Sequence, residues 1–229
     1  MVVPPGGERA ATALGIYEAR GERASILFFV CGPRTRELCE LRPGDHFAVT
    51  GPLGNGFTFG DARDVAIVAG GVGIASVLLP AQSLVRMGKR VRLFYGARTA
   101  ELLVERDRFA DEGCEVICAT DDGSFGHHGF VTETLAAAEE KPDLILACGP
   151  SPMLRATSFV ACEMGVPAQL SLEETFACGV GGCWGCVVPL DRASPQAPSF
   201  PPASANGSDV VYARICKEGP VFWANELRW

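Results

Sequence analysis

The hydrophobic positions change their pattern along the chain. Up to about residue 62, apolar residues come in short segments, such as 25–30 and 47–50, which run into turn-forming glycine and proline. Segments of this kind predict β-strands. From about residue 64 the pattern changes: residues 65–69 form a continuous apolar run, and further predicted strands follow at 90–95, 115–119 and 143–148. Such runs are typical of parallel strands that are buried on both faces.

Segments of helical length separate these runs, one after the first run and others at about 101–112, 131–140 and 152–164. Strands that alternate with helices predict a doubly wound parallel sheet. After about residue 170 the alternation ends, and glycine and cysteine become frequent. We therefore expect mixed β and α/β architecture in three parts: a β domain over 1–62, an α/β domain over 63–169, and a small cysteine module over 170–229.

The charge balance and the N-terminus narrow the class of protein. The chain has 20 Lys and Arg against 27 Asp and Glu, and this net charge of −7 argues against a nucleic-acid or anionic-membrane partner. The N-terminus lacks the pattern of a signal peptide, which predicts a cytoplasmic protein without stable disulfides. Residues 65–85 carry no formal charge, but their glycines and proline favour a buried strand, a turn and a helix start over a membrane span.

Four of the ten cysteines have a recognisable spacing. Cys178, Cys183 and Cys186 follow the pattern C-x4-C-x2-C, and Cys216 comes later. This is the spacing of plant-type [2Fe–2S] sites, in which four thiolates hold two irons. A zinc site is the alternative, although structural zinc usually takes two tight ligand pairs. A low-complexity insertion at 193–209 separates the third cysteine from the fourth, and we expect it to be a flexible surface segment.

The other six cysteines have ordinary surroundings. Cys118, Cys148 and Cys162 lie in apolar patterns, and we expect them to be buried small hydrophobic residues. Cys31, Cys39 and Cys114 have no companion at ligand spacing. Adjacent histidines at 127 and 128 are expected to belong to a loop.

Two glycine-containing turns follow predicted strands, and their notable residues are Gly70, Gly71 and Gly73 in the first and Cys148, Gly149, Pro150 and Met153 in the second. Turns at the carboxyl ends of parallel strands form the ligand crevice of an open sheet. Glycine there lets a pyrophosphate approach the backbone at a helix N-terminus. A tight turn also needs glycine without any ligand, so the first turn alone leaves both interpretations open. A polar turn at 120–126 adds to the same edge.

Taken together, the motifs point to one family. In chain order they are Gly51-Pro52-Leu53-Gly54-Asn55-Gly56-Phe57, Gly70-Gly71-x-Gly73, Tyr95-Gly96-Ala97-Arg98, Thr120-Asp121-Asp122-Gly123-Ser124, Gly129-Phe130-Val131-Thr132, Cys148-Gly149-Pro150-x-Pro152-Met153-Leu154, Ala177-Cys178-Gly179-x-Gly181-x-Cys183-x-x-Cys186 and Cys216-Lys217-x-Gly219-Pro220-Val221-Phe222. Over about residues 15–222 the sequence resembles the electron-transfer subunit of NAD-dependent (type B) dihydroorotate dehydrogenase, in the ferredoxin-reductase superfamily.

This resemblance implies a β-barrel flavin domain, an NAD-binding domain and a C-terminal [2Fe–2S] domain. It implies a partner, the FMN-containing catalytic subunit that oxidises dihydroorotate to orotate in pyrimidine biosynthesis, usually in a heterotetramer. Electrons would pass from that FMN through the [2Fe–2S] cluster and FAD to NAD+, so no acid–base or nucleophilic residue is expected. NAD would lie at the two glycine turns. FAD would contact Leu27, Phe28, Phe29, Arg34 and Thr35.

Residues 12–15 depart from the family pattern. They align with an Arg-Pro-x-Ser motif that binds the flavin, but here neither the arginine nor the serine is present, and the barrel is shortened at its start. In the second flavin element, Arg34 replaces a glycine and Thr35 is kept. One alternative is therefore a flavin-free iron–sulfur subunit. Another is a subunit of a related oxidoreductase that acts on ferredoxin or sulfur compounds.

Overall fold

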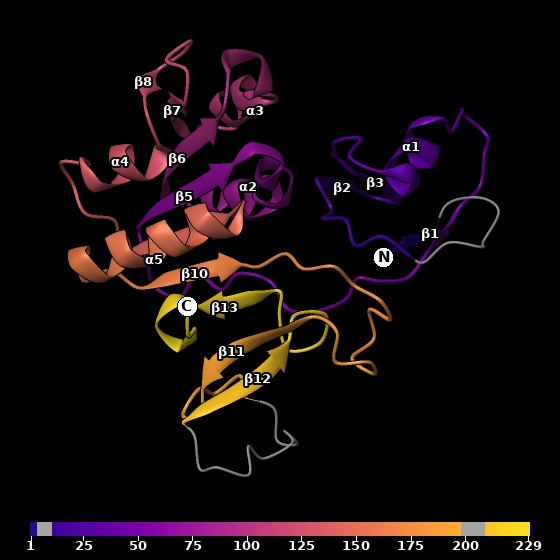
Figure 1. Cartoon of the computed structure of the whole chain (residues 1–229). Helices are drawn as coiled ribbons and strands as arrows, with labels where there is room; N and C mark the ends of the chain where they lie inside the picture. Colours follow the sequence, from indigo (N-terminus) through magenta and orange to yellow (C-terminus); the bar gives the residue numbers. More distant parts are fainter. Residues whose placement is uncertain (4–10, 198–208) are drawn as a thin grey trace.

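A seven-stranded sheet forms the centre of the molecule (Figure 1). The computed structural model describes residues 1–3, 11–197 and 209–229. The strands of the sheet, in spatial order, are β13 (Val221–Trp223), β10 (Ala168–Ser171), β9 (Leu144–Cys148), β5 (Asp64–Gly70), β6 (Arg90–Ala97), β7 (Glu115–Thr120) and β8 (His127–His128). All neighbours are parallel except β13, which is antiparallel to β10. The predicted parallel sheet is thus confirmed.

Three short strands of this sheet, β8, β10 and β13, were not predicted. The two histidines expected in a loop form β8, because they pair with the end of β7. Strands β10 and β13 lie where the alternation of strands and helices ends. Their pairing with neighbouring strands, rather than a local sequence pattern, identifies them. Since β13 comes from the C-terminal part of the chain, that part contributes a strand to the central sheet.

Helices cover both faces of the sheet. Helices α2 (Leu78–Arg86) and α3 (Arg106–Asp111) pack on one face, and α4 (Val131–Ala136) and α5 (Ser151–Met164) pack on the other. Two 3₁₀ turns, η1 (Gly71–Ser76) and η2 (Ala100–Leu102), complete this part. The helix expected at 101–112 is confined to α3. The helix expected at 131–140 ends at Ala136, and farther on the Glu140 carbonyl accepts a hydrogen bond from the buried side chain of Arg92.

The N-terminal region contains two small sheets and one helix. Strand β1 (Val2–Val3) pairs with β4 (Ala48–Val49), and β2 (Glu18–Arg20) pairs with β3 (Arg23–Ser25). Helix α1 (Pro33–Cys39) follows. The strand predicted over 25–30 is wrong beyond Ser25, because residues 26–30 have no neighbouring strand with which to form a ladder among the described residues.

The cysteine region packs directly on the sheet. Strands β11 (Val187–Asp191) and β12 (Val210–Arg214) form an antiparallel hairpin, and η3 (Ala224–Glu226) lies near the C-terminus. Apolar hairpin residues such as Leu190 and Ala213 are fully buried in the same core as Val68 of the sheet. At the start of the predicted insertion, Ser194 is buried and donates a hydrogen bond to the buried Glu226, whereas residues 193 and 195 are exposed. Residues 198–208 lie outside the described part.

The uncharged stretch 65–85 forms β5, η1 and most of α2, as its glycines and proline predicted. Among the helices of the described residues, none has both the length and the apolar character that a membrane span requires.

Candidate functional site: a crevice between two glycine turns and a set of paired thiols

The two predicted glycine turns lie side by side. Strands β5 and β9 are parallel neighbours, with Ala69 opposite Cys148, so both turns follow the carboxyl ends of adjacent strands. From β5 the chain proceeds outward through β6, β7 and β8, and then returns to β9 on the other side of β5. The strand order therefore reverses between these two strands. In open α/β sheets this switch point is where ligands bind, at the carboxyl ends of the strands.

Close packing explains most of the glycines in these turns. A Cβ atom at Gly73 would lie 2.2 Å from the carbonyl oxygen of Cys148, and one at Gly70 would lie 2.5 Å from Sδ of Met153. A Cβ atom at Gly149 would lie 2.7 Å from Cε of Met153. Gly71 differs, because it has a φ of 52° and open space where a side chain would be. Gly71 is therefore the residue of these turns whose backbone a ligand can approach.

The remaining residues of the second turn have separate roles. Pro150 caps helix α5, whose first turn contains no acidic residue, so the backbone N–H groups of the helix N-terminus lie at the carboxyl end of β9. Cys148 is fully buried, and burial raises the pKa of its thiol to about 12. Cys148 therefore contributes packing and backbone to the crevice rather than a thiolate. On β6, the Tyr95 hydroxyl donates to the carbonyl oxygen of Gly71 at 3.3 Å and holds that turn.

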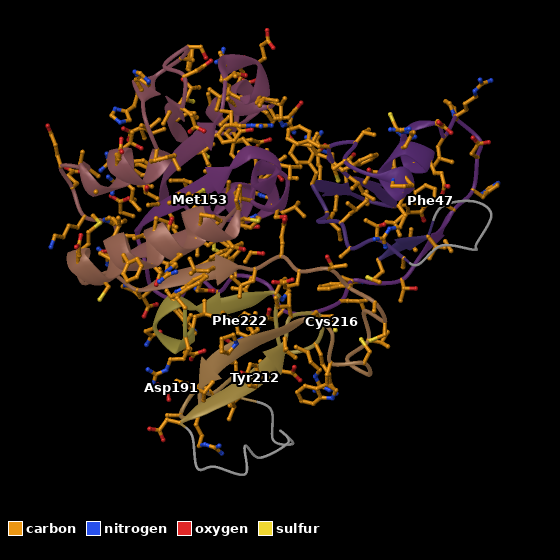
Figure 2. All side chains as sticks on the ribbon, in the orientation of Figure 1. Phe47, Met153, Asp191, Tyr212, Cys216 and Phe222 are labelled. Carbon is orange, nitrogen blue, oxygen red and sulfur yellow. The ribbon has the colours of Figure 1, made fainter. Side chains whose placement is uncertain are left out.

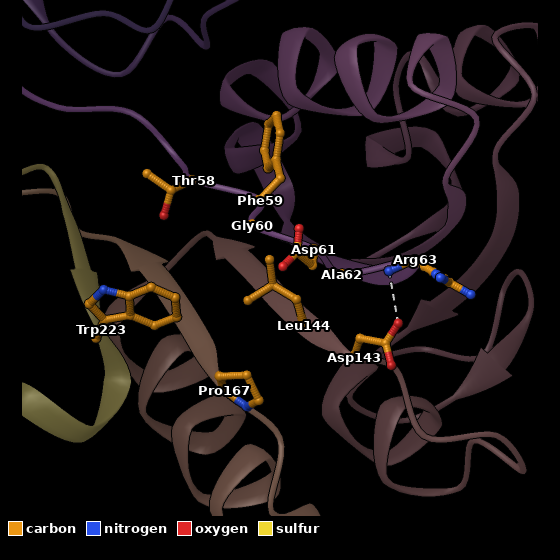
Figure 3. A pocket seen from close by; sticks show the side chains of 10 residues that line it. All are labelled: Thr58, Phe59, Gly60, Asp61, Ala62, Arg63, Asp143, Leu144, Pro167 and Trp223. Atoms are coloured by element: carbon orange, nitrogen blue, oxygen red, sulfur yellow. Dashed lines mark hydrogen bonds between the residues drawn. The ribbon is translucent and has the colours of Figure 1, made fainter.

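A cavity of about 600 Å³ lies at the opposite ends of these strands, where β5 and β9 begin (Figure 3). Phe59, Leu144, Pro167 and Trp223 are among its apolar lining residues. Asp143 closes one side, because its carboxylate accepts hydrogen bonds from the backbone N–H groups of residues 63 and 64 at 2.8 and 3.0 Å. The glycine turns lie at the carboxyl ends of these strands, so this cavity is separate from the predicted NAD site.

The four predicted ligand cysteines come together in two pairs. The thiols of Cys178 and Cys183 interact with each other, and the backbone N–H of Cys183 lies 3.4 Å from Sγ of Cys178. Likewise the thiols of Cys186 and Cys216 interact, and the N–H of Cys216 lies 3.5 Å from Sγ of Cys186. Within the described residues, no three or more His, Cys, Asp or Glu side chains converge as they would on a single metal ion.

The hairpin explains how the fourth cysteine reaches the other three. Val187 lies opposite Arg214, so the residues that follow β12 lie beside those that precede β11, and the N–H of Ile215 donates to the Cys186 carbonyl oxygen at 2.8 Å. Asp191 and Val210 are paired at the other end of the hairpin, where the insertion joins. Figure 2 labels Cys216 and Asp191 at these opposite ends. The insertion is therefore joined to the hairpin at the end away from the cysteines.

Backbone N–H groups surround the first thiol. Hydrogen bonds from the N–H groups of residues 180, 182 and 183, and from the Cys183 thiol, lower the pKa of Cys178 to about 6. In contrast, burial and the hydrogen bond with Cys186 raise the pKa of Cys216 to about 11. The glycine-rich loop thus already directs N–H donors at sulfur, which favours a negatively charged sulfur ligand.

A feature that sequence reasoning missed joins the N-terminal region to the cysteine region. The Asn55 amide donates to the carbonyl oxygens of Glu218 and Val221 at 3.0 Å each, and its Oδ1 accepts from the N–H of Val221 at 2.9 Å. Gly54 lies so close that a Cβ atom there would be 2.5 Å from the carbonyl oxygen of Gly219. The two motifs that contact one another, 51–57 and 216–222, were both part of the family resemblance, which was the available signal.

The predicted flavin residues lie in the N-terminal region. The Thr35 hydroxyl accepts hydrogen bonds from the N–H groups of Cys31 and Gly32 at 3.0 and 3.1 Å, so it stabilises the start of α1. The Arg34 guanidinium donates to the Ala11 carbonyl oxygen at 3.0 Å. Leu27 and Phe28 are half-buried, whereas Phe29 is exposed. Leu27 packs against the core cluster that contains Ile74 of the first glycine turn and Cys148 of the second.

Residues 12–15, which align with the missing flavin motif, lie against the α/β domain. A Cβ atom at Gly15 would be 2.6 Å from Oγ of Ser76 in η1. In the same segment, the Thr12 hydroxyl is buried and has no hydrogen-bond partner among the described residues. A polar ligand group would satisfy this hydroxyl, so the segment is compatible with a flavin beside the crevice.

Comparisons with known proteins agree with this geometry. The oxidoreductase NAD-binding domain family matches residues 67–158, which contain both glycine turns. The dihydroorotate dehydrogenase B (NAD(+)) electron transfer subunit of Caldanaerobacter subterraneus is 35% identical over 206 residues, which are 90% of this chain and 76% of that protein. The corresponding subunit of Geobacillus sp. WCH70 is 37% identical, over 96% of this chain and 79% of that protein.

The chain belongs to the family of dihydroorotate dehydrogenase B electron transfer subunits. A solved structure of an NADH-dependent reduced ferredoxin–NADP oxidoreductase, studied for flavin-based electron bifurcation, matches all of this chain and 78% of its own, with a TM-score of 0.83 and 28% identity. A cytochrome P450 reductase from Amycolatopsis matches 71% of this chain with a TM-score of 0.58 and 22% identity, which supports the fold alone.

The paired thiols of this electron transfer subunit fit a two-iron group better than a single zinc ion. A [2Fe–2S] cluster needs two thiolates on each of its two irons, and the thiols already form two pairs. Structural zinc usually takes two tight ligand pairs in the sequence, whereas these cysteines come as a triplet, Cys178, Cys183 and Cys186, and one distant residue, Cys216.

The other cysteines of the subunit are outside this site. Cys118 and Cys148 are buried, as predicted. The prediction for Cys162 is wrong, because its side chain is exposed. Helix α5 buries Leu154, Thr157 and Ala161, and the next residue along a helix points about 100° away from this face.

Proposed function

We propose that this chain is the electron-transfer component that accepts electrons from an FMN-containing, dihydroorotate-oxidising catalytic subunit and delivers them to NAD+. The observation that carries the proposal is that one chain combines a switch-point crevice with a set of paired thiols. The crevice has the construction of a dinucleotide site, and the thiols have the spacing and pairing of a [2Fe–2S] site. Family membership gives the reaction to which both belong.

We propose the same three parts that the sequence suggested. Residues 1–62 would form the flavin-binding β region, residues 63–169 the NAD domain, and residues 170–229 the cluster module. Strand β13 ties the last part to the second, since it extends the central sheet. Asn55 ties the first part to the last. These connections would hold the three sites at constant separations, which electron transfer requires.

The two proposed cofactors have different roles. Bound flavin exchanges both single electrons and hydride, and a [2Fe–2S] cluster carries single electrons. The chain's own residues bind and orient these groups. Cys178, Cys183, Cys186 and Cys216 would ligate iron, with N–H groups of the glycine-rich loop directed at the sulfur atoms. Gly71 and the N-terminus of α5 would receive the pyrophosphate of NAD. Leu27, Phe28, Phe29, Arg34 and Thr35 would contact FAD.

The visible spectrum, iron and acid-labile sulfide of anaerobically purified protein test the proposal. We expect flavin and cluster absorbance, with about two irons and two sulfides per chain. With the catalytic subunit added, dihydroorotate should reduce NAD+. A colourless protein that contains zinc would refute the cluster and therefore the proposed function.

A specific observation supports each of two alternative functions. The missing arginine and serine at residues 12–15 favour a flavin-free iron–sulfur subunit, which would show cluster absorbance without flavin. The likeness to the ferredoxin–NADP oxidoreductase favours a related ferredoxin enzyme. Activity with reduced ferredoxin, and none with dihydroorotate in the presence of the catalytic subunit, would support that second alternative.

A further inference from the structure

The side chain of Arg214 contacts two loops of the cysteine site. Its Nη1 donates to the carbonyl oxygen of Gly181 at 2.6 Å, within the loop between Cys178 and Cys183. Its guanidinium carbon lies 4.3 Å from the centre of the Trp184 ring, and Trp184 lies between Cys183 and Cys186. Arg214 itself precedes Cys216 by two residues. One guanidinium therefore contacts both loops that separate the first three cysteines and is close in sequence to the fourth.

Glu218 holds this guanidinium in a single orientation. Nε of Arg214 donates to Oε2 of Glu218 at 3.0 Å, and Nη2 donates to Oε1 at 2.5 Å. The backbone N–H of Arg214 donates to the same carboxylate at 2.7 Å. Only 11% of the Arg214 side chain and 14% of the Glu218 side chain are exposed. Two-point pairs of this kind are strong and directional, so the arginine is in place before any ligand binds.

The loop that Arg214 contacts has a backbone that needs support. Trp184 has a φ of 56°, in the left-handed region that bulky residues rarely adopt. Such a conformation costs free energy and persists only where surrounding contacts stabilise it. The stacked guanidinium is such a contact, since cations are attracted to the face of an indole ring. The hydrogen bond to Gly181 stabilises the preceding turn, where φ is 80°.

The charge of Arg214 has a second consequence. Four thiolates give an iron–sulfur group a net negative charge, and reduction adds one more electron. A fixed positive charge nearby stabilises the reduced form more than the oxidised form, so it raises the reduction potential. The Glu218 carboxylate has the opposite effect. Because the guanidinium makes the contacts to the cysteine loops, the positive end of the pair faces the site.

We propose that Arg214 is a positioning residue for the cysteine loops and that its charge raises the reduction potential of the bound [2Fe–2S] cluster. Glu218 orients Arg214, and its negative charge lowers the same potential. This inference rests on the proposed function, because it presupposes that the cysteines hold such a cluster. It adds a residue that neither the cysteine spacing nor the family motifs assign.

Three substitutions in the full-length chain separate position from charge. Arg214→Lys keeps the charge but loses the planar two-point pair and the hydrogen-bond fork. Arg214→Gln removes the charge, and Glu218→Gln removes the opposing charge. Arg228→Gln is the matched control, because Arg228 pairs with Asp191 at the far end of the hairpin, away from the cysteines. Each variant is reconstituted anaerobically with iron and sulfide.

Two measurements are made on each variant. The first is the rate at which an iron chelator removes the cluster absorbance. The second is the midpoint potential from a redox titration followed by electron paramagnetic resonance. We expect Arg214→Lys to lose its cluster about tenfold faster than the unchanged chain, with a nearly unchanged potential. Arg214→Gln should lower the potential and Glu218→Gln should raise it, each by up to about 59 mV, a tenfold change for a one-electron couple.

The outcomes discriminate clearly. Potentials that shift in the same direction for Arg214→Gln and Glu218→Gln, or that match Arg228→Gln, would overturn the electrostatic role. If Arg214→Gln holds no cluster, Glu218→Gln decides that role alone. A chelation rate of Arg214→Lys equal to that of the unchanged chain would overturn the positioning role. An unchanged chain that takes up no iron and sulfide would refute the cluster itself, whereas a cluster that ignores these substitutions would refute only the role of Arg214.

Discussion

The contact between Asn55 and the segment after Cys216 offers a quantitative test of how the parts of the chain are joined. Asn55→Ala removes three side-chain hydrogen bonds, two to the carbonyl oxygens of Glu218 and Val221 and one from the N–H of Val221. It leaves the backbone hydrogen bond from the N–H of residue 55 to Gly219 in place. The change is therefore confined to the junction.

The magnitude follows from which partners are left unsatisfied. Gln196 also donates to the carbonyl oxygens of Glu218 and Val221, at 3.3 and 2.9 Å, so these acceptors keep a partner. The N–H of Val221 loses its Asn55 acceptor, and Val221 is only 6% exposed. A net hydrogen bond is worth about 1 kcal/mol, and an orphaned buried group costs about 1–3 kcal/mol. We expect the variant to lose about 2 kcal/mol of unfolding free energy.

Urea unfolding followed by tryptophan fluorescence measures this loss, because Trp223 lies two residues after Val221. Hydrogen exchange of the Val221 amide should also accelerate, since local opening then costs less. Asn225→Ala is the control, because Asn225 is an exposed asparagine in η3. A loss below about 0.5 kcal/mol, equal to the control, would refute the idea that Asn55 joins the two regions.

Three further results are expected. Cys183→Ser should abolish cluster absorbance and NAD+ reduction by dihydroorotate while the secondary structure seen by circular dichroism persists; NAD+ reduction without the cluster would exclude the relay. Gly73→Ala places a Cβ atom 2.2 Å from the Cys148 carbonyl oxygen. It should therefore destabilise the fold by about 1–3 kcal/mol and weaken NAD binding measured by calorimetry. An unchanged stability and affinity would argue against tight packing of the turns. The N–H groups of residues 63 and 64 lower the pKa of Asp143, so its carboxylate stabilises the folded state above the unfolded pKa, and this contribution disappears as the pH falls through the lower folded pKa. Asp143→Asn should therefore unfold with a shallower dependence on pH below about 4, and identical acid-unfolding curves would contradict this.

Much of the fold follows from local patterns. The four predicted strands became β5, β6, β7 and β9 because strands buried on both faces are mostly apolar. The alternation with helices was sufficient for the doubly wound sheet, and the cysteine spacing was sufficient to group four thiols. These features depend on neighbours in sequence, so the order of residue types determines them.

The tertiary structure decided what depends on distant residues. Whether residues 26–30 form a strand depends on a partner strand, which the described residues do not supply. Conversely, β10 is a strand because it pairs with β9 and β13, and β13 is one because it pairs with β10. The Asn55 contact joins residues 163 positions apart. The pairing of Cys186 with Cys216 and the contact of Arg214 with Gly181 likewise depend on the hairpin, which brings residues 214–216 back beside residue 186. Such contacts arise from chain folding in space, and the residue pattern near either partner does not specify them.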